Sequence, residues 1–214
     1  MPARPGFAAA LVCLSLLPAG AETLDRIAVT VGKHVMTQSD VRLDVRVSAF
    51  VDGKPPDLSG PQLRKAAERM VDLYLVLEDA AATRAPEPSA SDVAALVAPI
   101  RARYPSDAEY QAALTRAGIT EDDLKMHLLE GLWMMRYTDL RFRPEVEVSD
   151  DDLHAAFNAV TAKLPAGAPA PSFDASRGKL EELVLNQRMI DALDKWLAMA
   201  RAETPILYRD AAFR

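Results

Sequence analysis

The sequence predicts a mainly α-helical fold, in which several helices are joined by a small sheet built from strands near the two ends of the chain. Over most of the chain, apolar residues recur at intervals of three and four, which is the spacing of one helix face. Strand-like segments are predicted at 25–31, 34–36 and 205–209. A lone strand leaves its backbone N–H and C=O groups unpaired, so we expect the first and last segments to pair with each other.

The first of these segments, DRIAVTV (25–31), alternates between apolar and polar positions. We expect Ile27, Val29 and Val31 to share the buried face of a half-buried strand. A glycine-containing turn then leads to the short second strand at 34–36.

Helix starts are marked by a hydroxyl residue followed three positions later by an acid. The hydroxyl accepts a hydrogen bond from the backbone at the start of the helix, and the acid accepts one from the cap residue. The pattern occurs at Thr37/Asp40, Ser106/Glu109, Thr120/Asp123 and Ser149/Asp152. The predicted helices cover 38–50, 62–83, 92–103, 107–117, 121–141, a stretch beginning at 150, and 176–203.

Two of these helices carry a long apolar stripe, which predicts the face that packs in the core. In the helix over 62–83 the stripe consists of Leu63, Ala66, Ala67, Met70, Leu73, Tyr74, Leu77 and Ala81. In the helix over 176–203 it consists of Leu180, Leu183, Val184, Gln187, Ile190, Leu193 and Leu197.

The first 21 residues have the pattern of a secretory signal peptide, with Arg4, the apolar stretch 7–17 and a small-residue cleavage site at 19–21. We expect export to the periplasm, with Glu22 as the first mature residue. The single cysteine, Cys13, lies in this segment, so the mature chain is expected to form no disulfide.

The charge of the mature chain argues against two classes of partner. Without Arg4, 24 basic residues stand against 31 acidic ones, a net charge of −7 with both signs interleaved. We therefore expect neither nucleic acid nor an anionic membrane surface as a partner.

Several segments together resemble the helical N-terminal domain of SurA-type periplasmic chaperones. They are LDRIAVTVGKHVMTQSDV (24–41), LRKAAERMVDLYLVLEDA (63–80), YPSDAEYQAALTRAGITEDDLKMHLLEGLWMMRYTDLRF (104–142), VEVSDDDLHAAF (146–157) and PILYR (205–209). The resemblance covers most of the mature chain. It implies one helical domain made of residues 22–162 and completed by the helix and strand of residues 178–214.

In that family, one or more parvulin-type prolyl isomerase domains stand between the acidic helix start and the last helix. This chain has only the proline-alanine linker KLPAGAPAPSFDASR (163–177) at that place. Its histidines, His34, His127 and His154, all lie outside the linker. We therefore expect no isomerase domain and no enzymatic activity.

Known catalytic and cofactor-binding patterns are missing from the sequence. It contains no G-x-S-x-G, no glycine-rich phosphate loop, no H-E-x-x-H and no metal-spaced cysteines. The acidic run 150–152 is explained by the favourable interaction of acids with a helix N-terminus. We expect no cofactor, no metal and no small-molecule substrate.

The segment GLWMMRYTDLRF (131–142) carries more large apolar residues than one helix face can bury. Methionine and aromatic side chains suit a surface that accepts varied extended peptides. The predicted peptide-binding residues are Tyr104, Met126, Trp133, Met134, Tyr137 and Phe142. The alternative is that these side chains only join the core between the helices.

Together, the residues and the resemblance predict an ATP-independent periplasmic chaperone. It would bind unfolded or extended exported polypeptides, which the resemblance implies to be outer-membrane protein precursors. Two alternatives remain open at this point: a degenerate prolyl isomerase, and an assembly subunit that binds one fixed protein partner.

Overall fold

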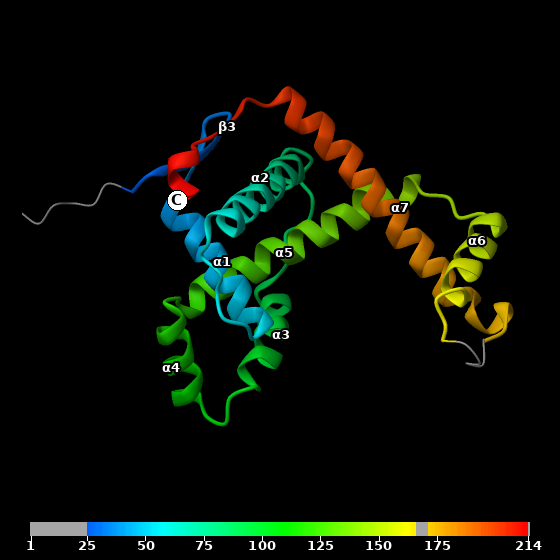
Figure 1. Ribbon diagram of the computed structural model, residues 1–214, viewed down its shortest axis with the longest axis horizontal. Coiled ribbons are helices and arrows are strands. Elements are labelled where there is room, and N and C mark those ends of the chain that lie inside the picture. Colours follow the sequence, from blue (N-terminus) through cyan, green and yellow to red (C-terminus); the bar gives the residue numbers. More distant parts are fainter. Residues whose placement is uncertain (1–24, 166–170, 214) are drawn as a thin grey trace, which may run out of the picture.

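The computed structural model describes residues 25–165 and 171–213, and the predicted signal peptide (1–21) lies outside the described residues (Figure 1). The elements are, in order, β1 (Ile27–Val31), β2 (His34–Thr37), α1 (Gln38–Asp52), α2 (Gly60–Ala82), α3 (Ala90–Arg101), α4 (Asp107–Ala117), α5 (Glu121–Phe142), η1 (Arg143–Glu145), α6 (Asp150–Thr161), α7 (Phe173–Glu203), β3 (Ile206–Tyr208) and η2 (Asp210–Phe213). The mainly helical fold with a small terminal sheet is confirmed. None of the helices in the described ranges is both long and apolar enough to cross a membrane.

The sheet joins the two ends of the described chain, as the sequence predicts. Its strand order is β2-β1-β3, and both pairs are antiparallel. Val29 lies opposite Tyr208, and Val31 lies opposite Ile206. Two further backbone hydrogen bonds close the pairing, from Gly32 N to the Pro205 carbonyl (2.9 Å) and from Arg209 N to the Ala28 carbonyl (2.8 Å).

The predicted inward face of β1 is wrong at one position. Val29 and Val31 are buried, but Ile27 is 45% exposed and Ala28 is buried in its place. The pairing of β1 with β2 shifts register between Ile27 and Val29. An irregularity of this kind inserts an extra residue, so the alternation changes phase and Ile27 turns outward.

The predicted helix caps form. Thr37, Thr120 and Ser149 each accept a hydrogen bond from the backbone three residues on, and each makes the reciprocal bond of a full capping box. Ser106 accepts a hydrogen bond from the Glu109 backbone, but the predicted reciprocal bond to the Glu109 side chain does not form. A further capping box at Ser89 starts α3.

The last helix begins earlier than predicted. Ser172 caps α7 at Phe173, within the predicted linker 163–177, by accepting a hydrogen bond from Ala175 N (3.2 Å). The Phe173 ring stacks on the His154 ring of α6 at 4.1 Å between centroids. This aromatic contact and the serine cap stabilise a first helical turn that the linker composition did not indicate.

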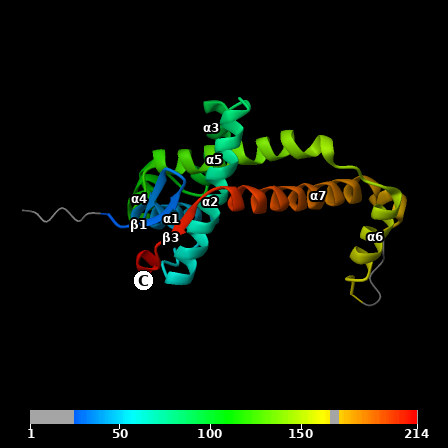
Figure 2. The ribbon, with the colours of Figure 1, turned by 90° about the horizontal axis from the view of Figure 1, so that it is seen from above.

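Most buried side chains form two cores. The first joins the sheet, α1, α2, α5, the C-terminal part of α7 and η2. The second lies where α1 and α5 meet α4 and the end of α3. Figure 1 shows α7 crossing α5 near the C-terminal end of α5, where the two helices are in contact, and Figures 1 and 2 show α6 at the end of α7 far from the sheet. At 31 residues, α7 is about 46 Å long, which lets one helix reach both ends of the molecule.

The predicted stripe of α7 is buried only near its ends. Leu197 packs in the first core and Leu180 is buried against α6, but Leu183 is 52% and Ile190 51% exposed. The middle of α7 crosses between the two packed regions, so its apolar face there has no complete cover.

Candidate binding groove

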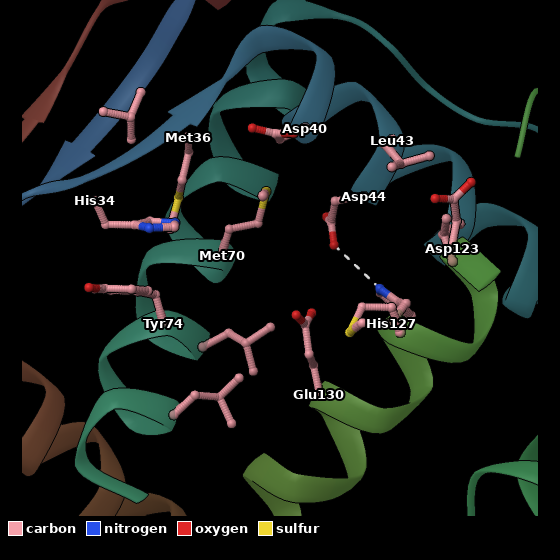
Figure 3. Close-up of a pocket in the computed structure, with 15 residues that line it drawn as sticks. His34, Met36, Asp40, Leu43, Asp44, Met70, Tyr74, Asp123, His127 and Glu130 are labelled. Carbon is pink, nitrogen blue, oxygen red and sulfur yellow. Dashed lines mark ion pairs between the residues drawn. The ribbon is translucent and has the colours of Figure 1, made fainter. Parts of the chain in front are cut away.

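An open groove lies between β2, α1, the second half of α2 and the first half of α5 (Figure 3). We call it the methionine groove, because Met36, Met70 and Met126 line it from three different elements. Its volume is about 440 Å³, within the range of roughly 300–1,000 Å³ that is usual for ligand pockets. The lining consists of His34, Val35, Met36, Asp40, Leu43, Asp44, Val47, Met70, Leu73, Tyr74, Leu77, Asp123, Met126, His127 and Glu130.

The α2 wall of the groove comes from a stripe that the sequence assigned to the core. The prediction is confirmed for Leu63, Ala66 and Ala67, which are buried. Further along, the buried residues of α2 are Val71, Leu75, Val76 and Ala80 instead. The predicted residues Met70, Leu73, Tyr74 and Leu77 are only partly buried and line the groove. The helix thus has one face in the core and a second apolar face open to solvent.

The β2 wall is braced by an aromatic pair. The His34 imidazole stacks on the Tyr74 ring, with 4.3 Å between centroids and an interplanar angle of 12°. The Tyr74 hydroxyl donates a hydrogen bond to Glu78 on the next turn of α2 (2.8 Å). Next to this pair Met36 is buried, while Val35 is 44% exposed at the mouth of the groove. The ring is therefore held in place and presents a flat apolar surface.

The opposite side of the groove is acidic, and most of its acids have partners. Asp40 and Asp123 accept hydrogen bonds in the capping boxes of α1 and α5. Asp44 lies 3.5 Å from His127 Nδ1, the contact dashed in Figure 3. Its other oxygen is 3.2 Å from Arg69 Nη2. These three carboxylates are thus held by the fold itself.

Glu130 differs from the other acids of the groove. In Figure 3 its carboxylate points from α5 into the space between α2 and α5. Across residues 25–165 and 171–213, no side-chain hydrogen bond or ion pair to Glu130 is found. Burial raises the pKa of the Glu130 carboxyl above its ordinary value, while the nearby His127 lowers this pKa and Asp44 adds to the rise. Burial therefore disfavours the charged form of this partly exposed carboxylate.

The groove therefore combines an apolar surface with an anionic wall. Within the described part of the chain, no three His, Cys, Asp or Glu side chains have a geometry that could hold a metal ion. Its lining contains no lysine and no arginine. Such a surface can bind apolar side chains and, beside them, a positively charged group.

The structure separates the six predicted peptide-binding residues. Met126 lines the methionine groove and is 54% exposed. Tyr104 stacks on Phe50 in the second core, with 6.0 Å between centroids. Trp133 and Met134 are partly buried against the first core.

Tyr137 and Phe142 are each only 4% exposed, so the prediction that they lie on an open surface is wrong. The Tyr137 hydroxyl donates to Asp79 of α2, and this bond draws the ring inward. Tyr137 and Phe142 are buried between the helices, which is the alternative given above for these side chains.

A second recess, which we call the α5/α7 groove, has a volume of about 610 Å³. Its apolar lining includes Met135, which is 62% exposed, and Leu140, which is 58% exposed. The apolar lining is completed by Tyr137 of α5, Met189 of α7, and Ala85 and Pro86. Segment 131–142 thus does present apolar surface, but through Met135 and Leu140 instead of the residues predicted.

Sequence reasoning missed most of the methionine groove. Its residues come from β2, α1, α2 and α5, and no short motif joins them. The signals were the predicted residue Met126 and the stripe of α2, whose spacing is the same for a face in the core and for a face lining a groove.

The comparisons with known proteins add no assignment. No model of a protein family matches the chain, and no curated protein matches it.

Proposed function

We propose that this protein is an ATP-independent chaperone that binds unfolded or extended polypeptides in the methionine groove, without isomerase activity. The observation that carries the proposal is the open apolar lining of this groove, supplied by three methionines, a braced tyrosine and several aliphatic side chains. Methionine side chains are flexible and polarizable, so they adapt to ligands of different shape. This suits a protein that must bind many unrelated segments.

The compartment belongs to the same proposal. The signal-peptide pattern of residues 1–21 and the resemblance to SurA-type chaperones both support export to the periplasm. The clients would then be exported chains, with outer-membrane protein precursors as the class that the resemblance suggests. Cell fractionation with a C-terminal tag checks this, and recovery of the unprocessed chain in the cytoplasm would contradict it.

Release of a client needs no nucleotide in this scheme. An open groove makes shallow contacts, and the exposed fraction of Met126 shows that its side chain has no cover of its own. Shallow contacts give weak affinity. Weak affinity means fast dissociation here, because differences in affinity between related complexes come mostly from the dissociation rate. A client would exchange between chaperone and solution until it folds or is handed on.

The test is suppression of aggregation of several unrelated unfolded proteins, without ATP, by the protein and by two variants. Met126→Gln removes an apolar contact of the groove, whereas Met199→Gln makes the same change at a site outside both grooves with similar exposure, 59% against 54%. Burying a methionine is worth about 1.5–3 kcal/mol, so even partial burial in a complex predicts roughly tenfold weaker binding for Met126→Gln. Met199→Gln should act as the unmodified protein does.

Equal activity of all three proteins would exclude the methionine groove as the binding surface. No suppression by any of them would contradict the chaperone proposal itself. Proline-limited refolding tests the missing isomerase activity, and catalysis well above the uncatalysed rate would contradict that part.

The α5/α7 groove favours a second candidate, a subunit with one fixed partner. Met135, Leu140 and the exposed residues Leu183 and Ile190 of α7 form apolar surface on two neighbouring helices. A fixed partner would cover such a surface permanently. Capture of one folded protein in stoichiometric amount, with no effect on unrelated unfolded chains, would support this candidate against the chaperone.

A further inference from the structure

The methionine groove has an uneven charge, and this restricts what it can hold. Four carboxylates and two histidines line it, with no lysine or arginine among the lining residues. Asp40 and Asp123 are engaged at helix N-termini, and Asp44 is shared between His127 and Arg69. The remaining carboxylate, that of Glu130, points into the groove (Figure 3).

A half-buried carboxylate without a partner costs stability, because neither water nor a counter-charge fully replaces its hydration. A glutamine would fill the same space on α5 at lower cost. Groups whose surroundings oppose their charge are common at binding sites, where the ligand supplies the missing interaction. The missing interaction here is a positive charge.

We propose that Glu130 forms a cation subsite within the methionine groove, so that the segments bound there carry a lysine or arginine flanked by apolar residues. This inference rests on the proposed chaperone function and states which segments the groove prefers. The occupant is an extended segment of a client polypeptide. Charge complementarity with the unpaired carboxylate identifies it, and the apolar residues that line the same groove explain the flanking residues.

The opposite wall fits the same occupant. Tyr74 lines the same groove from α2, with its ring beside His34 of β2 (Figure 3). Its ring is stacked on His34 through one face, so the ring is rigidly oriented. A guanidinium or ammonium group is attracted to tyrosine rings as well as to carboxylates, and its aliphatic stem can lie on Met70 and Leu73. An apolar segment without a cation would leave Glu130 desolvated further.

The cost of Glu130 can be measured without any ligand. Its raised pKa means that the folded state holds the proton more tightly than the unfolded state does. Below the unfolded pKa, near 4.3, both states are protonated and no penalty exists; as the pH rises above that value, the penalty grows. Glu130→Gln should therefore raise the urea midpoint at pH 7 and leave it nearly unchanged at pH 4.

Other titratable or charged groups surround Glu130, and all of them are unchanged in the Glu130→Gln variant. These are Asp40 and Asp44 of α1, Asp123 and His127 of α5, and His34 of β2, with Arg69 of α2 behind Asp44. Because all are present in the variant as well, the difference between the two proteins isolates Glu130.

The decisive experiment measures binding of three labelled nine-residue peptides by fluorescence anisotropy at low salt and pH 7.5. The peptides share the same leucines and phenylalanine and differ only at the central residue, which is Arg, Gln or Glu. We expect the Arg peptide to bind about tenfold more tightly than the Gln peptide, and the Glu peptide more weakly than either. In Glu130→Gln this preference should vanish.

Asp122→Asn is the matched control. It removes one negative charge from the same helix at a side chain that is 95% exposed and outside the groove lining. It should retain the tenfold preference. Loss of the preference in both variants would mean that net charge alone steers the peptides, which overturns the subsite.

The two proposals fail in different ways. If all three peptides bind the unmodified protein equally well, the cation subsite is wrong and the chaperone proposal stands. If no peptide binds and unfolded clients still aggregate, both are wrong. Because the peptide comparison uses the unmodified protein, the result does not depend on how well any variant folds.

Discussion

The C-terminal segment closes the first core, and replacing Phe213 by alanine should expose how much this closure contributes. Phe213 is 8% exposed and packs in that core, next to the buried Ala212. The carbonyl of Ala212 accepts a hydrogen bond from the Gln38 side chain (2.7 Å). The Arg64 guanidinium lies over the ring of Tyr208 at 3.8 Å and that of Phe213 at 5.6 Å.

The expected loss follows from this burial. Truncating a buried phenylalanine to alanine typically costs about 3–5 kcal/mol, because the favourable burial of the ring is lost and a cavity remains in its place. Phe213 lies in the short helix η2, whose backbone can relax into part of the cavity, so we expect about 3 kcal/mol. In a domain of this size, that loss corresponds to a fall of roughly 6–12 °C in Tm.

A glycine provides an independent check of the same contact. A Cβ at Gly60, the first residue of α2, would lie 2.2 Å from the Phe213 carbonyl oxygen. Gly60→Ala must therefore push η2 away from α2, which disturbs the packing of the Phe213 ring. The double variant should cost less than the two single variants added together, by about 1 kcal/mol or more, because both changes disrupt one contact.

The assay is urea unfolding followed by tryptophan fluorescence, since Trp196 packs against the first core. Leu207→Ala is the control, because Leu207 is a neighbouring strand residue that is 48% exposed. It should cost less than about 1 kcal/mol. A Phe213→Ala cost as small as the control's would refute the view that the C-terminal segment completes the core.

Three further substitutions test hydrogen bonds inside the molecule. Tyr110→Phe should be neutral or stabilising by about 1 kcal/mol, because the buried Tyr110 hydroxyl has no partner among the described residues; a loss in urea unfolding would contradict this. Tyr137→Phe should instead cost about 1–2 kcal/mol in the same assay, since it removes the bond to Asp79, and a neutral result would show that this bond contributes nothing. Arg201→Met should cost about 1–2 kcal/mol at pH 7, because Arg201 Nε lies 2.7 Å from Asp72 and burial already raises the pKa of that carboxyl. The cost of Arg201→Met should disappear at low pH, because Asp72 is then protonated in both the folded and the unfolded state. A cost that does not change with pH would mean that the substitution acts through lost packing instead.

Local signals in the sequence were sufficient to predict most of the helices and strands. The serine and threonine caps located helix starts because a capping box is made by residues three positions apart, whatever the rest of the chain does. Pairing of the first and last strands was also predictable, since unpaired backbone groups leave few alternatives. The start of α7 escaped prediction because a contact between Phe173 and His154, on two different helices, supports it.

The faces of the helices were decided by tertiary packing. The stripe of α2 has one spacing throughout, yet its first part is buried and its second part, from Met70 to Leu77, lines a groove. Tyr137 and Leu140 are three residues apart on α5, and one is buried while the other is exposed. Helical periodicity states which residues share a face, but which face is covered depends on where the neighbouring helices lie.

The sequence alone therefore determined the helical class, the capped helix starts and the meeting of the two ends, because each depends on neighbouring residues or on backbone hydrogen bonding. Tertiary packing sets where apolar surface stays open and which acid of the methionine groove lacks a partner. Met36, Met70, Met126 and Glu130 come from β2, α2 and α5, and packing alone brings them to one groove.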